Sequence, residues 1–358
     1  MIPVVQMTLS DARPTTDRAT PPGPTPQRYS LAADAGSDLG GRLTPVPPKQ
    51  RGGATVWALA GLFWCVVAGQ AAIRWVSSST QFRPAPIVGP DEMSDARMVA
   101  LRTFEGLSAL VLVWFLWYCV IKPLRATGRL SLDGKFVIGG LCAWWADAFL
   151  NIHSYLFAWN GNNIDMGVWT SFMPFHNHAE SSRYGESLLW GPPMYVYFCA
   201  GVAIVACRYV VPLRQRRPTM SNTTLFTAVF VGEFAFDFIV ENIAIRATHG
   251  YAYAQTYGPL TLWKGSVHQF PLYESVLVAS LGVLFTWMRI RAMEDPDGLS
   301  PVEKGFERWR PGLQSYVRAF AVIGFCCVSI VFVYHLTFNW LGLVGTSHAH
   351  LPSYLLAG

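Results

Sequence analysis

Long uninterrupted apolar runs constrain this sequence more than any other feature. A helix needs about 20 mostly apolar residues to cross the hydrocarbon core of a membrane. We expect about seven membrane-spanning helices, near residues 55–76, 99–121, 136–158, 189–211, 223–245, 269–288 and 319–341. The composition agrees, since 52% of the residues are hydrophobic and only 14% are charged. The predicted fold class is an all-α, polytopic membrane helical bundle.

Basic side chains mark the topology of this bundle. They gather after the second, fourth and sixth predicted helices, as Lys122, Arg125, Arg129, Arg214, Arg216, Arg217, Arg289, Arg291, Lys304, Arg308 and Arg310. The positive-inside rule therefore predicts a cytoplasmic N-terminus and a C-terminus outside a multi-pass plasma-membrane protein. Because the positive charges follow the helix ends, the net charge of +5 does not indicate a nucleic-acid partner. No feature indicates a protein partner, and the lipid bilayer is the expected surrounding.

Three regions differ in composition. Residues 1–50 are rich in Pro and lack hydrophobic periodicity, which predicts a disordered cytoplasmic tail. Residues 51–345 form the predicted transmembrane domain, and residues 346–358 a short C-terminal tail. The longest outer connections, 159–188 and 246–268, are rich in aromatic residues, Gly and Asn, and we expect them to pack against the mouth of the bundle.

The fifth predicted helix carries three acids, Glu233, Asp237 and Glu241, in the stretch GEFAFDFIVENIAIR. On an insertion scale its apolar residues contribute about −4 to −7 kcal/mol, whereas three central acids cost about +8 to +10 kcal/mol. Their i, i+4, i+8 spacing places the three carboxyls on one stripe of the helix. The stripe must therefore face the interior of the bundle or a wet cavity.

Other predicted helices carry polar residues at the same depth, near their outer ends. These are Arg102, Glu105, Asp147, Asn151, His153, His268, Gln269, Tyr273 and Glu274. We expect them to line a polar chamber in the outer half of the bundle. Carboxyls without a cationic partner in a dry chamber are protonated near neutral pH, which is the state that a general acid needs. Arg246 lies four residues after Asn242. We expect it to orient that amide and, through its charge, to lower the pKa of Glu241.

Other interpretations of these residues stay open. The acids could pair with Arg102, Arg246 and the histidines in a purely structural network. Two H-x-H pairs, at 176–178 and 348–350, could join other histidines at a zinc or iron site, but the several His boxes of membrane di-iron enzymes are missing. We therefore predict no metal, and because the sequence has no glycine-rich phosphate loop and no nucleotide fingerprint, we predict no organic cofactor. Trp169 and the other tryptophans near the outer ends fit either an interfacial belt or the lining of a cavity.

An ordered set of motifs resembles the AveC-type spirocyclase family of actinobacterial membrane proteins. The set comprises residues 130–135 (LSLDGK), 147–151 (DAFLN), 163–169 (NIDMGVW), 237–246 (DFIVENIAIR) and 269–274 (QFPLYE). The resemblance extends from about residue 55 to 341 in order and spacing. It implies spiroketal formation in polyketide biosynthesis, in which an apolar dihydroxy-ketone closes to a bicyclic spiroketal with loss of water.

The resemblance also implies a set of site residues. Asp147, Asp237 and Glu241 form the expected acid/base group, and Glu274 with Tyr273 a second donor and acceptor. Asn151, Arg246, His268 and Trp169 are the expected substrate-binding or orienting residues. The alternative is a small-molecule or proton-coupled membrane transporter, because intramembrane acids are also normal there. A structural protein whose acids only hold helices together is the third possibility.

Overall fold

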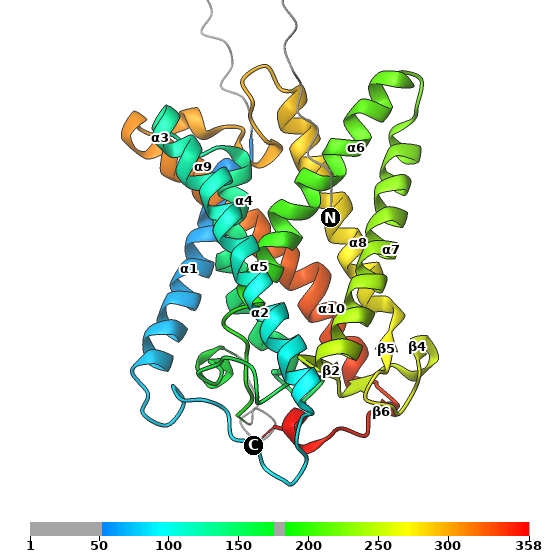
Figure 1. The fold of residues 1–358 in the computed structure, drawn as a ribbon. Helices are drawn as coiled ribbons and strands as arrows, with labels where there is room; N and C mark the ends of the chain where they lie inside the picture. Colours follow the sequence, from blue (N-terminus) through cyan, green and yellow to red (C-terminus); the bar gives the residue numbers. More distant parts are fainter. Residues whose placement is uncertain (1–51, 175–182, 358) are drawn as a thin grey trace, which may run out of the picture. The chain divides into compact units, whose positions relative to one another are not determined.

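The computed structural model describes residues 52–174 and 183–357, which belong to one compact unit (Figure 1). Six helices in this part of the chain are long and apolar enough to cross a membrane, at Ala54–Val76, Asp95–Thr127, Gly191–Arg216, Asn222–Thr248, Leu272–Glu294 and Pro311–Leu343. All six overlap runs predicted from the sequence. The predicted fold class, an all-α membrane helical bundle, is confirmed.

The six long helices are built from shorter segments. They are α1 (Ala54–Val76); α2 (Asp95–Phe115) with η1 (Leu116–Ile121) and α3 (Lys122–Thr127); α5 (Gly191–Val196) with η4 (Tyr197–Gly201) and α6 (Val202–Arg216); α7 (Asn222–Thr248); α8 (Leu272–Glu294); and α9 (Pro311–Ser329) with η8 (Ile330–His335) and α10 (Leu336–Leu343). The segments η1, η4 and η8 are π-helical turns. A π turn changes the direction of the side chains that follow it and often marks a functional site.

The third predicted run, 136–158, differs from the other six. It is α-helical only in α4 (Leu132–Ala143), continues as the 3₁₀ helix η2 (Trp144–Asn151), and then leaves the helix. Asn151 explains this exit, because its Oδ1 accepts hydrogen bonds of 2.9 Å from the backbone N–H groups of both Leu156 and Phe157. Its Nδ2 also donates to the carbonyl oxygen of Phe157 at 2.8 Å. The side chain thus fixes a tight turn where the apolar pattern alone predicts a longer helix.

Short antiparallel strand pairs join the outer connections. The strands are β1 (Phe157–Trp159) with β2 (Tyr251–Tyr253), β3 (Gln255–Thr256) with β6 (Ser347–His348), and β4 (Thr261–Leu262) with β5 (Phe270–Pro271). The short 3₁₀ helices are η3 (Thr170–Phe172), η5 (Gly258–Leu260), η6 (Pro301–Glu303), η7 (Phe306–Arg308) and η9 (Ser353–Leu355). The described part of segment 346–358 is therefore packed on the bundle rather than a free tail, and Leu355 is fully buried. The segment 1–50, predicted to be disordered, lies outside the described residues.

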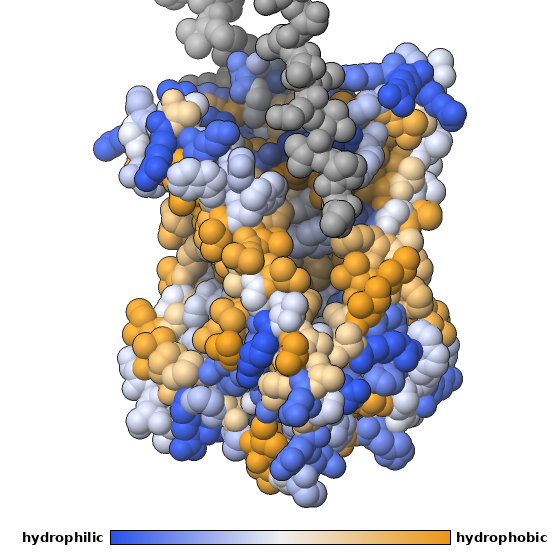
Figure 2. Space-filling model, in the orientation of Figure 1, coloured by the Kyte–Doolittle hydropathy of each residue, from blue (hydrophilic) through white to orange (hydrophobic). Residues whose placement is uncertain are grey.

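The two ends of the bundle differ. The labelled strands and the C-terminus lie at one end, called the strand end below, whereas α3 and the connection between α6 and α7 lie at the other, called the basic end (Figure 1). On the face in Figure 2, hydrophobic side chains gather over the middle of the bundle and hydrophilic ones over the basic end. This banding is that of a protein in a bilayer. The assignment of the basic end to the cytoplasm stays a prediction.

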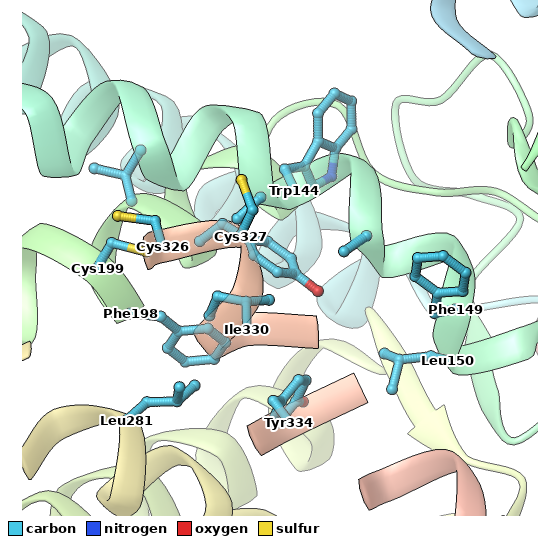
Figure 3. Close-up of a cluster of buried hydrophobic side chains, with 14 of the residues drawn as sticks. Trp144, Phe149, Leu150, Phe198, Cys199, Leu281, Cys326, Cys327, Ile330 and Tyr334 are labelled. Atoms are coloured by element: carbon cyan, nitrogen blue, oxygen red, sulfur yellow. The ribbon is translucent and has the colours of Figure 1, made fainter. Parts of the chain in front are cut away.

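The core forms where η2, η4, α8, α9 and η8 meet. Figure 3 shows these elements contributing Trp144, Phe149, Leu150, Phe198, Cys199, Leu281, Cys326, Cys327, Ile330 and Tyr334 to one buried cluster. Helix α1 packs on α9 at two glycines. A Cβ added to Gly324 would lie 2.1 Å from the carbonyl oxygen of Trp57, and one added to Gly61 would lie 2.2 Å from that of Phe320. The two backbones touch because neither position has a side chain.

Candidate active site: a buried cluster of carboxyls

The three acids of α7 all point into the bundle. Glu233, Asp237 and Glu241 are 6%, 6% and 8% exposed. Phe236 and Ile239 between them are exposed at 47% and 55%, as expected for side chains that face lipid. The acidic stripe inferred from the spacing is therefore an interior stripe, next to α8.

Glu241 is bound by the strand β2. The hydroxyl of Tyr253 donates a hydrogen bond of 2.7 Å to Oε2 of Glu241. Tyr251 is a second hydroxyl partner of the same carboxyl. The two tyrosines are two residues apart on one strand, so their side chains point the same way. The connection that follows α7 therefore places the hydroxyls of Tyr251 and Tyr253 next to Glu241.

Asp237 and Glu233 lie deeper along α7. Asp237 lies beside Glu241 and Ser275, and its Oδ2 is buried with no hydrogen-bond partner. Oε2 of Glu233 accepts a hydrogen bond of 3.4 Å from Tyr197. Gly282 of α8 makes room for Glu233, because a Cβ added there would lie 2.8 Å from its Cγ.

Glu274 begins α8 and is fully buried. Its Oε1 accepts a hydrogen bond of 2.5 Å from the hydroxyl of Tyr334, and its Oε2 is buried without a partner. Glu274 also lies within electrostatic range of Glu241, Asp237 and Asp147. It therefore connects the acids of α7 with the acid of η2.

Asp147 belongs to a second chain of contacts. The hydroxyl of Tyr195 donates to Oδ1 of Asp147 and also forms a hydrogen bond of 2.8 Å with Nε2 of His335. A phenol has one proton, so donation to Asp147 requires that His335 donate through Nε2–H. The π turn η8 places the adjacent residues Tyr334 and His335 so that one contacts Glu274 and the other contacts Tyr195.

Glu186 completes this second chain. It is fully buried in the connection before α5, and its Oε1 accepts a hydrogen bond of 2.9 Å from Nε1 of Trp144. Burial raises the pKa of Glu186 well above its usual value, and the neighbouring Asp147 carboxyl raises it further. The two carboxyls lie close enough to interact. Two adjacent buried carboxyls are costly to charge together, so we expect Glu186 to hold a proton.

The cluster has no cationic partner among the described residues. The ion pairs among the described residues involve acids outside the cluster, namely Glu105, Asp133, Glu294, Asp295 and Glu303. Buried charges without counterions are costly, so a cluster of this kind holds protons rather than several negative charges. Its direct partners are phenols and an indole, which donate hydrogen bonds, and the imidazole of His335 is linked to it through Tyr195.

The predicted orienting residues occupy other places. Asn151 binds backbone at the turn after η2. Trp169 donates through Nε1 to the carbonyl oxygen of Trp145 at 2.9 Å. The hydroxyl of Tyr273 accepts a hydrogen bond of 3.3 Å from the backbone N–H of Tyr257. These three side chains support the walls around the carboxyls.

Arg246 and His268 are not brought to the carboxyls. The guanidinium of Arg246 is exposed and lies 4.3 Å from the ring centre of Trp263. Position 246 is five residues after Glu241, which places it on another face of α7. The ring of His268 lies 5.1 Å from that of His249. Arg246 therefore lies in the last turn of α7, and His268 lies in the connection between α7 and α8.

Side chains of the motif at 163–169 form hydrogen bonds with the backbone of neighbouring loops. Oδ1 of Asp165 accepts hydrogen bonds of 2.8 Å from the backbone N–H groups of Ala85 and Gly167. Burial raises the pKa of Asp165 to about 6, against the lowering effect of these two bonds. Asn163 donates to the carbonyl oxygens of Gly185 and Gly250 at 3.2 and 3.1 Å. The motif thus holds the connection that carries Glu186.

Sequence reasoning missed Glu186, Tyr195, Tyr334 and His335. Glu186 lies in a loop, and the other three lie in apolar runs where Tyr and His carry no distinctive spacing. The one sequence feature that could have indicated this part of the site is Glu186, an acid a few residues before an apolar helix.

No group of three His, Cys, Asp or Glu suited to a metal ion occurs in residues 52–174 and 183–357. The pair His176 and His178 lies outside these ranges. His348 and His350 are exposed beside β6.

The fold and the site define an integral membrane protein with a buried carboxyl cluster near one end. The profile of the AveC-like spirocyclase family matches residues 127–353, so the chain belongs to that family. No curated protein and no solved structure matches the chain. The matched region contains Asp147, Glu186, Asp237, Glu241 and Glu274, and α1, α2 and η1 lie before it. The suspected family is therefore confirmed over most of the bundle.

Proposed function

We propose that this chain is a membrane-embedded spirocyclase-type enzyme of the plasma membrane. Its substrate is an apolar, polyketide-like or lipid-like dihydroxy-ketone, which it closes to a spiroketal by carboxyl acid/base catalysis. The observation that carries the proposal is the buried cluster of acids, with a carboxyl oxygen of Asp147, Glu186, Asp237 and Glu274 each lacking a hydrogen-bond partner. Family membership supports the reaction type.

The reaction requires one acid and one base. One substrate hydroxyl adds to the ketone carbon and gives a hemiketal. An acid then protonates the hemiketal hydroxyl, which leaves as water, and the second hydroxyl attacks the oxocarbenium-like carbon. A carboxylate accepts the proton of that hydroxyl, so the proton donated in the first step is recovered. The balance is one spiroketal and one water, and no cofactor is needed.

We assign the proton donation to Glu186, because it is fully buried beside Asp147 and burial raises its pKa well above the usual value. Asp147, Asp237 and Glu241 form the group that supplies the single carboxylate acceptor, and Glu274 with Tyr273 is a second donor and acceptor. Tyr195, Tyr253 and Tyr334 hold three of these carboxyls through hydrogen bonds. Carboxyls fixed on η2, α7 and α8 would select which face of the ketone is attacked.

A rate assay with the purified full chain in detergent tests the proposal. A synthetic dihydroxy-ketone is the substrate, and Asp237→Asn and Glu241→Gln are the variants. Loss of a general acid or base typically costs about 10²- to 10⁴-fold in rate, so we expect a loss of that size. Glu307→Gln, an exposed acid outside the cluster, is the matched control and should stay within about 2-fold.

A wild-type rate equal to that of buffer would overturn the proposal for this substrate class. The same variants reconstituted in liposomes test the alternative. Proton-linked uptake of the ketone that needs Asp237 and Glu241, without ring closure, would assign the cluster to transport.

A further inference from the structure

A cavity with basic and apolar lining residues lies at the basic end, away from the carboxyl cluster. It has a volume of about 720 Å³, within the range of ligand sites. Its walls come from the end of α3, the start of α4, η7 and the first turns of α9 (Figure 1). The lining residues are Leu124, Gly128, Arg129, Leu130, Lys135, Phe306, Pro311, Gln314, Ser315, Tyr316, Arg318 and Ala319.

The charges around this cavity are mostly positive. Lys135 and Arg318 both bind Oε1 of Glu303, Arg318 through Nε at 2.9 Å. Burial alone would raise the pKa of Glu303, but Lys135 and Arg318 lower it below its usual value. Glu303 is therefore a carboxylate that fixes two cations in the wall. Arg129, Lys135 and Arg318 all line the cavity. The single negative charge of Glu303 therefore neutralises only part of their positive charge.

Apolar side chains continue from the cavity onto the outer surface of the bundle. Leu124, Leu313 and Tyr316 are 44%, 45% and 62% exposed. Nearby, Arg125 of α3 lies over the ring of Trp117 of η1. Basic and aromatic residues together are typical of the level of lipid headgroups. A ligand here meets cations at one end and hydrocarbon at the other.

We propose that this cavity binds the headgroup phosphate of an anionic phospholipid, whose acyl chains lie along α3 and α9. Basic pockets between membrane helices bind such headgroups through the same combination of charge and position. A free phosphate ion uses the cations and gains nothing from Leu124, Leu313 and Tyr316. The exposed apolar side chains therefore favour the lipid. This site does not depend on the proposed reaction.

Lipid retention by the full chain tests the proposal. The protein is exchanged into nanodiscs of phosphatidylglycerol and phosphatidylcholine, and the lipids that survive extraction into detergent are counted by native mass spectrometry. Arg129→Gln removes an exposed cation, and Arg129→Gln/Arg318→Gln removes two. We expect the double variant to bind phosphatidylglycerol at least about 10-fold more weakly. The control Arg216→Gln/Arg217→Gln removes two exposed charges from the same end and should bind as wild type does.

Three results would overturn the proposal. The first is equal retention by Arg129→Gln and the control. The second is equal retention of phosphatidylcholine and phosphatidylglycerol by wild type. The third is displacement of the lipid by millimolar inorganic phosphate, which would identify a small anion as the ligand. Thermal unfolding of each variant shows whether a loss of binding reflects a loss of fold, and Arg129→Gln decides if the double variant is unstable.

Discussion

Nε1 of Trp144 donates a hydrogen bond of 2.9 Å to Oε1 of Glu186. The bond joins the start of η2 to an acid in the connection before α5, 42 residues further along the chain. It holds beside Asp147 a carboxyl whose pKa is raised by burial, within the family-matched region. The geometry suits an acid that donates a proton repeatedly without moving.

Replacement of this acid separates chemistry from structure. In Glu186→Gln the amide oxygen can still accept from Trp144, but no carboxyl proton is available. We expect ring closure to slow by about 10²-fold or more. The melting temperature should stay within about 2 °C. Infrared spectra should lose one protonated carboxyl band, and an unchanged rate would remove Glu186 from the reaction.

The bridge through Tyr195 can be tested in the same assay. Tyr195→Phe removes the hydroxyl that contacts Asp147 and His335. Because both groups stay buried and lose a partner, we expect a destabilisation of about 1–3 kcal/mol and a rate loss of about 10-fold or more. Tyr209→Phe, an exposed tyrosine on α6, is the control. Equal behaviour of the two variants would contradict the bridge.

The contact between α1 and α9 predicts a sharp difference between two glycines. Gly324→Ala places a methyl group 2.1 Å from a backbone oxygen, whereas Gly69→Ala meets nothing within 4 Å. The first should cost roughly 1–3 kcal/mol or more and lower the melting temperature by several degrees. The second should be neutral or gain up to about 1 kcal/mol from the lower chain entropy of alanine. Equal melting temperatures would mean that the helices do not pack as described.

His249 predicts how stability depends on pH. Burial, with Arg97 and His268 nearby, lowers its pKa from 6.5 to about 4. Between these values the unfolded chain binds a proton that the folded chain does not, so stability falls as the pH drops from about 6.5 to 4. The contribution is on the order of 1–2 kcal/mol after solvent screening.

His249→Asn should remove this contribution, since Asn accepts the positive φ of 48° at this position. The measurement is the difference in melting temperature between wild type and variant at pH 7 and at pH 4.5. A difference that does not change between the two pH values would contradict the assignment.

Most of the bundle could be predicted because hydrocarbon thickness sets helix length. Six apolar runs became helices at the predicted places. The third run did not continue, because Asn151 captures two backbone N–H groups and ends the helix, and hydropathy does not report such a bond. The strand pairs were also missed, since Phe157 pairs with Tyr253 across nearly a hundred residues and neither run is long enough to show alternation.

The site was predictable where helical spacing applies. Glu233, Asp237 and Glu241 follow the period of α7, so their shared burial could be derived. Glu186 reaches the cluster through a loop, and Tyr334 and His335 reach it through a π turn. No regular period describes either. Arg246 was expected to act on Glu241 from sequence proximity, whereas its guanidinium lies over the ring of Trp263, a contact that helical spacing does not report.

The stereochemistry of the product tests the central claim most directly. The same dihydroxy-ketone is incubated with the wild-type chain, with Asp237→Asn and with buffer alone. The spiroketal stereoisomers that form are then separated by chiral chromatography. If the buried carboxyls catalyse closure in a fixed site, the wild type gives one dominant stereoisomer, and Asp237→Asn gives much less of it. A wild-type product with the stereoisomer ratio of the buffer reaction would contradict the account.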